Sequence, residues 1–122
     1  MHEASLAGEI SAIVERRAAP GARVLAITLE IGALAGVERH ALLFALESAL
    51  AGTRAEGATV HVLSLPAKAR CGHCGTEQAI DIRYQACEAC GKPSLEILQG
   101  AEMRVRSLVV SAGDAAASDS SQ

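Results

Sequence analysis

The feature that most constrains this chain is a set of four cysteines arranged in two pairs. They occur as Cys71-Gly-His-Cys74 and Cys87-Glu-Ala-Cys90, separated by twelve residues, and the chain has no other cysteine. A glycine follows each pair and lets the chain turn back, so that both thiolates of a pair are directed at one point. Two pairs with this spacing are typical of a closed, tetrahedral zinc site.

Two other uses of paired cysteines compete with zinc. Disulfides are typical of secreted proteins, and we find no signal peptide in this sequence. A redox Cys-x-x-Cys usually occurs once, at a strand-to-helix junction, whereas these pairs lie between turns. We therefore expect zinc, and four thiolates leave no open coordination position for catalysis. Zinc would hold together a segment with almost no apolar core, because such sites contribute about 10–16 kcal/mol to folding.

Composition limits the classes of function. The 122 residues suffice for one small domain plus a zinc module, and the only aromatic residues are Phe44 and Tyr84, so we expect an aliphatic core. The net charge of −3 and the lack of a basic stripe argue against a nucleic-acid partner. No apolar run has membrane-spanning length. Reduced thiols without an export signal predict a cytoplasmic protein.

Hydrophobic periodicity predicts an α+β fold, with a three-stranded sheet covered by two helices and an inserted, zinc-ribbon-like four-cysteine module. The expected elements are helices at 4–17 and 38–51, strands at 23–31, 58–65 and 102–110, and a short strand at 95–98. The expected domains are residues 1–66 plus 100–110, a zinc-binding domain at 67–99, and a disordered tail at 111–122.

The chain begins Met1-His2-Glu3. A histidine at position two is usually a solvated surface residue. A free Met1 amine, the His2 amide nitrogen and the His2 imidazole can also chelate one ion, however, and nitrogen-rich, near-planar sets suit Ni²⁺ or Cu²⁺. Glu3 can add an oxygen ligand.

The chain resembles the HypA/HybF hydrogenase maturation factors, which are nickel metallochaperones, from Met1 to about Val110. Four features carry the resemblance: Met1-His2-Glu3; Glu30-Ile31-Gly32 followed by Gly36-Val37-Glu38; Ala51-Gly52-Thr53 before Ala55-Glu56-Gly57; and the cysteine pairs followed by Leu95-Glu96-Ile97 and Gly100-Ala101-Glu102-Met103.

The resemblance implies two metal sites. Nickel is the transferred cargo, with His2 as the principal ligand beside Met1, and with Glu3 and Glu38 at the same site. Cys71, Cys74, Cys87 and Cys90 match the structural zinc ligands. The implied partners are a nickel-binding GTPase and the large subunit of [NiFe] hydrogenase, with urease as another client.

One segment departs from the family pattern. Many members have Gly-Val-x-Pro-Glu at the start of the second helix, and this chain has Gly36-Val37-Glu38-Arg39-His40. It therefore loses a proline and an early glutamate that favour a helix start. We consider two interpretations of His40, a further metal ligand and a surface histidine at a helix start, and the sequence favours the second. His73, inside the first cysteine pair, is expected beside the zinc ligands.

We expect no enzymatic activity, because the sequence contains neither a catalytic constellation nor a phosphate-binding loop. The alternative function is a zinc-ribbon interaction module in transcription or complex assembly, which would give Met1-His2-Glu3 no role. A thiol-disulfide protein is a third hypothesis. A homodimer also stays open, because an inserted module joined by two chain crossings can be exchanged between copies.

Overall fold

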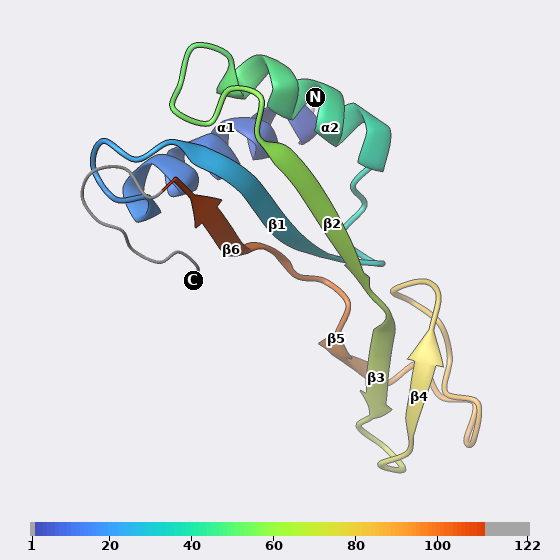
Figure 1. Cartoon of the computed structure of the whole chain (residues 1–122). Coiled ribbons are helices and arrows are strands. Elements are labelled where there is room, and N and C mark those ends of the chain that lie inside the picture. Colours follow the sequence, from blue (N-terminus) through green and yellow to red (C-terminus); the bar gives the residue numbers. More distant parts are fainter. Residues whose placement is uncertain (1, 112–122) are drawn as a thin grey trace. The chain divides into compact units, whose positions relative to one another are not determined.

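A computed structural model describes residues 2–111 of the chain (Figure 1). The elements in order are α1 (His2–Arg17), β1 (Val24–Gly32), α2 (Arg39–Leu50), β2 (Thr59–Leu65), β3 (Ala67–Cys71), β4 (Glu77–Ile80), β5 (Leu95–Gln99) and β6 (Met103–Val110). They form two compact units. Unit 1 comprises the chain up to Leu29, Val37–Leu63 and the chain from Arg104 on, and unit 2 comprises Glu30–Gly36 and Ser64–Met103.

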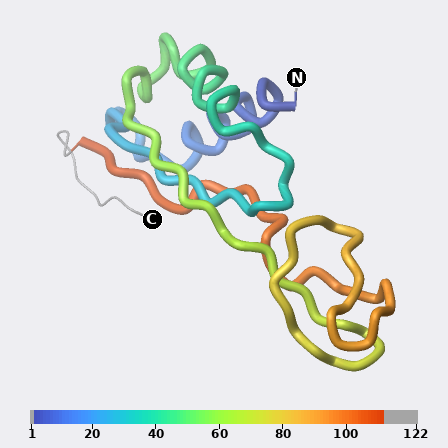
Figure 2. Tube along the Cα trace, turned by 90° about the vertical axis from the view of Figure 1, so that its right-hand side faces the viewer, coloured from blue at the N-terminus to red at the C-terminus, as the bar shows by residue number. Residues whose placement is uncertain are grey.

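Unit 1 has the architecture predicted from the sequence. Its strands belong to a sheet in the order β2-β1-β6, and both helices cover the same face of that sheet (Figure 1 and Figure 2). The interior is aliphatic, as the composition predicted, and its most deeply buried side chains are Ile10, Ile27, Leu29, Leu42 and Leu46. Phe44 and Tyr84 are 75% and 91% exposed, so neither aromatic residue contributes to a core.

Helix α1 begins at His2, two residues earlier than its periodicity predicted. Glu3 lies in its first turn, where a carboxylate is favourable at the positive end of the helix dipole. At the other end, Arg54 donates hydrogen bonds to the carbonyls of Glu15 and Ala22 at 3.1 Å each, and an ion pair of 3.2 Å joins it to the Glu15 carboxylate. These contacts satisfy carbonyls at and beyond the helix end and fix the direction in which the chain leaves α1.

Unit 2 contains a second three-stranded sheet, in the order β4-β3-β5. Both pairings of β3 are antiparallel, with Ala69 opposite Gln78 on β4 and opposite Ile97 on β5. The sequence analysis predicted β5 but neither β3 nor β4. Strand β3 does alternate between buried and exposed positions, but its first buried positions are alanines, and β4 has a single large apolar residue. Their hydrophobic signal is therefore too weak for recognition from sequence.

The second sheet gives unit 2 a small apolar core, which corrects the expectation that this part of the chain almost lacks one. Ala67, Ala69 and Ile80 are buried, and Leu34, Leu95 and Ile97 pack against them. Leu34 comes from a segment that the sequence analysis assigned to the other domain.

Two glycines bring backbones into close contact in unit 2. A Cβ on Gly32 would overlap the Gly100 carbonyl group. Gly100 has φ +111°, and a Cβ there would lie 2.5 Å from Ala67 Cα. Hydrogen bonds from Gly32 N to Glu102 O (2.8 Å) and from Leu34 N to Gly100 O (2.7 Å) join the two segments. Only glycine allows this approach.

The predicted disordered tail at 111–122 lies outside the described residues except for Ser111, whose N–H donates to the Arg23 carbonyl at 2.8 Å. In the part of the chain that the structure describes, no helix is both long enough and apolar enough to cross a membrane.

Candidate metal centres

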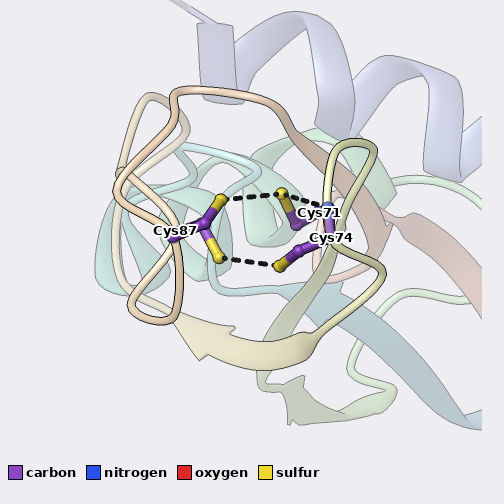
Figure 3. A group of neighbouring side chains, drawn as sticks. Cys71, Cys74 and Cys87 are labelled. Atoms are coloured by element: carbon purple, nitrogen blue, oxygen red, sulfur yellow. Dashed lines mark hydrogen bonds between the residues drawn. The ribbon is translucent and has the colours of Figure 1, made fainter.

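Unit 2 brings all four cysteines to one point. Their sulfur atoms lie within 4.8 Å of one another, and Cys71 Sγ is 3.7 Å from Cys90 Sγ. Cys74 Sγ is also 3.7 Å from Cys87 Sγ (Figure 3). Four sulfur atoms about 2.3 Å from a tetrahedral zinc ion lie about 3.8 Å apart, so the arrangement fits zinc. The cysteines are unpaired thiols, which excludes the disulfide alternative in this structure.

The two pairs form nearly identical turns. Cys71 Sγ accepts the backbone N–H of His73 at 3.3 Å, and Cys87 Sγ accepts that of Ala89 at the same distance. The glycine that ends each turn donates to the carbonyl of the first cysteine, at 2.8 Å for Gly75 and 2.9 Å for Gly91. Both glycines have a φ near +80°, which favours glycine. The backbone of each turn therefore directs its two thiolates at one point.

The second cysteines of the two pairs, Cys74 and Cys90, have different environments. Cys74 Sγ and the Thr76 hydroxyl form a hydrogen bond of 3.3 Å, and this bond, followed by one from the Thr76 backbone, lowers the pKa of Cys74 to about 6. For Cys90, the Lys92 N–H lowers the pKa, but desolvation and the neighbouring thiols outweigh it and raise the pKa to about 11. Four neighbouring thiols thus do not all ionise readily by themselves, and a cation that compensates their charge is needed.

The second group of predicted ligands lies in unit 1. His2 is exposed at the start of α1, and Met1 lies outside the described residues. Glu3 Oε2 accepts the backbone N–H of Glu38 at 2.9 Å, so the first turn of α1 lies beside the start of α2. This hydrogen bond, and next the backbone N–H of Glu3 itself, lower the pKa of Glu3. The structure thus places the Glu3 carboxylate against the backbone of Glu38, and whether the two residues share a nickel site stays a prediction.

Glu38 is the N-cap of α2. Its Oε1 accepts the N–H of Ala41 at 2.8 Å and its Oε2 accepts that of His40 at 3.3 Å; these bonds, in that order, lower its pKa. Helix α2 thus begins where the sequence predicted it, and Glu38 supplies the cap in the absence of the family's proline. His40 Nδ1 lies 3.6 Å from Glu38 Oε2, and its side chain is 91% exposed.

Several features of these sites have little or no signal in the sequence. The contact of the Thr76 hydroxyl with Cys74 Sγ was not predicted from the sequence. His73 contacts Cys71 through its backbone, and Ala89 makes the same contact without an imidazole, so this contact needs no histidine. His61 is exposed on β2. Among the described residues, the four cysteines are the only group of three or more metal-ligating side chains whose ligand atoms lie close together.

A two-helix α+β unit with an exposed N-terminal histidine, together with a second unit built around four thiols, defines a small protein with two distinct candidate metal centres. The model of the HypA family, described as "Hydrogenase/urease nickel incorporation, metallochaperone", matches residues 1–110. The chain therefore belongs to the HypA family of nickel-incorporation metallochaperones.

Individual relatives agree with this assignment. The "Hydrogenase maturation factor HypA" of Azotobacter chroococcum is 44% identical over 112 residues, which cover 90% of this chain and 99% of the relative. The protein with the same description from Geobacter sulfurreducens is 39% identical over 110 residues, with the same coverage. Because the matches extend far outside the cysteine module, they do not favour the alternative of an isolated zinc-ribbon module.

Solved structures agree on the fold. The solution structure of the nickel metallochaperone HypA from Helicobacter pylori superposes with a TM-score of 0.65 at 23% identity, covering 87% of this chain and 94% of that one. The fold class predicted from the sequence, with two helices on a sheet and an inserted four-cysteine module, is confirmed. The family assignment from the sequence is confirmed as well.

Proposed function

We propose that this nickel-incorporation protein binds its cargo at the N-terminus, through the Met1 amine, the His2 amide nitrogen and the His2 imidazole. The observation that carries the proposal is that α1 begins at His2. The first N–H groups of a helix have no intrahelical acceptor, so nickel can replace the proton of the His2 amide, which is released to solvent, without breaking a helical hydrogen bond. The imidazole is exposed beside it.

Glu3 and Glu38 contribute negative charge to the same site. A cation at the start of α1 faces the positive end of the helix dipole, an unfavourable contribution of about 0.3–1 kcal/mol at an exposed site. The two carboxylates offset it, and their lowered pKa values keep them charged at neutral pH. An exposed site balanced in this way releases nickel more easily than a buried one, as a carrier requires.

Cys71, Cys74, Cys87 and Cys90 hold a structural zinc ion. The closed set of thiolates leaves no coordination position for a substrate, and the ion stabilises unit 2. The protein acts as a carrier and not as a catalyst. It works with a nickel-binding GTPase and delivers nickel to the large subunit of a [NiFe] hydrogenase, or to a urease. This takes place in the cytoplasm, where thiols stay reduced. A homodimer is compatible with this role.

The test is a titration of Ni²⁺ into protein with its native N-terminus. The His2→Ala variant should lose stoichiometric nickel binding while it retains one zinc ion and its helix content. A Gly-Ser extension before Met1 should weaken binding too, because it removes the free amine from the chelate. Undiminished nickel affinity in both proteins would show that the cargo binds elsewhere.

A further inference from the structure

The pair formed by Glu38 and His40 has a geometry that helix capping does not require. The cap uses the carboxylate of Glu38 and the backbone N–H groups of His40 and Ala41. It does not need an imidazole at position 40, yet Nδ1 of His40 lies 3.6 Å from Oε2 of Glu38. That distance is longer than a hydrogen bond, and a small rotation of the exposed His40 side chain closes it.

A histidine that binds a metal generally directs its other ring nitrogen at a carboxylate or carbonyl. This contact fixes the tautomer, so that Nδ1 carries the proton and the lone pair of Nε2 is free for the metal. His40 has this arrangement, with Glu38 at Nδ1 and Nε2 on the opposite edge of a ring whose side chain is 91% exposed.

The pair also lies beside the proposed cargo site. Glu3 accepts the N–H of Glu38 at 2.9 Å, so a direct hydrogen bond joins the residue after His2 to the residue that faces His40. All of these residues belong to unit 1. The residues next to the N-terminus and the residue that faces the His40 imidazole are therefore in direct contact.

We propose that His40 Nε2 is an additional nickel ligand in this chain and that Glu38 acts through His40, as the group that orients its imidazole. This inference rests on the proposed N-terminal nickel site. It makes Glu38 a positioning residue, because its carboxylate caps α2 and directs Oε2 at His40 Nδ1.

The experiment measures nickel sulfate binding by calorimetry and counts coordinated imidazoles by X-ray absorption, using full-length, zinc-loaded protein with a native N-terminus. The wild-type protein should show two imidazoles and His40→Ala one, with affinity reduced about tenfold or more, the range seen when a group around a metal is removed. His61→Ala is the matched control. His61 is also exposed in unit 1, and no ion pair of the described residues involves it, so its loss should change neither readout.

A double-mutant cycle tests the role of Glu38. Glu38→Gln retains an oxygen that can cap α2 but loses the carboxylate charge. It should weaken nickel binding more in the wild-type background than in the His40→Ala background, where only the loss of its negative charge remains. An equal loss in both backgrounds would overturn the orienting role and make Glu38 a direct contributor.

The experiment distinguishes failure of the His40 ligand from failure of the N-terminal nickel site. If His2→Ala abolishes binding while His40→Ala keeps two imidazoles and wild-type affinity, His40 is not a ligand and the N-terminal site stands. If His2→Ala leaves binding intact, the proposed nickel site itself is wrong. Circular dichroism of each variant verifies that α2 persists.

Discussion

At the scale of single residues, Glu38 shows how one side chain can replace a family pattern. The usual N-cap residues are short, and glutamate is not among the preferred ones. Here its longer side chain reaches the N–H groups of both His40 and Ala41, and its own N–H is bound by Glu3. The missing proline therefore does not leave the helix start unsatisfied, and the same contacts join α2 to the N-terminal residues.

The bond between Glu3 and Glu38 predicts a pH dependence. Hydrogen bonding to the Glu38 N–H and to its own N–H lowers the pKa of Glu3, so its contribution to stability is present above the pKa of the unfolded chain. That contribution is lost as the pH falls through the lowered pKa of the folded state. We expect the Glu38 amide resonance to titrate at a pH below the ordinary pKa of glutamate, and the part of this titration that comes from Glu3 to disappear in Glu3→Gln. A Glu38 amide that titrates identically in both proteins would contradict the assignment.

At the scale of elements, the contact between Gly32 and Gly100 gives a physical reason for two of the motifs that carry the family resemblance. Glu30-Ile31-Gly32 ends β1, and Gly100-Ala101-Glu102-Met103 joins β5 to β6. The segments exchange backbone hydrogen bonds at a separation that excludes a Cβ. Both motifs therefore contain glycine for a reason of packing, and neither contains a predicted metal ligand.

We expect Gly32→Ala to destabilise the protein by about 1–3 kcal/mol or more, the usual effect of overpacking, because the new methyl group meets the Gly100 backbone. Gly8→Ala is the matched control. Gly8 lies in α1 with nothing within 4 Å of an added Cβ, so alanine there should stabilise by about 0.5–1 kcal/mol. Urea unfolding of both variants measures the difference. Equal effects would show that the Gly32 contact relaxes at no cost.

At the scale of the whole molecule, the two units differ in what holds them together. Unit 1 has a set of fully buried aliphatic side chains from both helices and the sheet. Unit 2 has a core of two alanines and one isoleucine with three half-buried neighbours, beside four thiols that fit a metal. Removal of the metal should therefore affect the units unequally.

Chelation of zinc, or the variant Cys71→Ala, is expected to remove most of the hydrogen-exchange protection in residues 67–99 and to leave α1 and α2 protected. Structural zinc contributes about 10–16 kcal/mol, which the small core of unit 2 does not replace. Amide exchange followed by mass spectrometry measures both regions in one sample. Protection lost uniformly along the chain would show that the units unfold together.

The sequence by itself determined the fold class, the four-cysteine site and the order of the main elements. These depend on spacing and periodicity, which are local properties: two cysteines three residues apart share a turn, and leucines at helical spacing share a face. The family followed from the same local motifs in their order along the chain.

Only the tertiary structure decided the contacts between segments far apart in sequence. Strands β3 and β4 form because each gains hydrogen bonds from partners that a short, alanine-rich pattern does not reveal. The link from Glu3 to Glu38 and the approach of Gly32 to Gly100 join residues 35 and 68 positions apart, and no local pattern encodes such pairs. The role of Glu38 as a cap facing His40, from which the proposed nickel ligand follows, became visible only with side-chain positions, because one glutamate in a sequence is compatible with a ligand, a cap or a solvated charge.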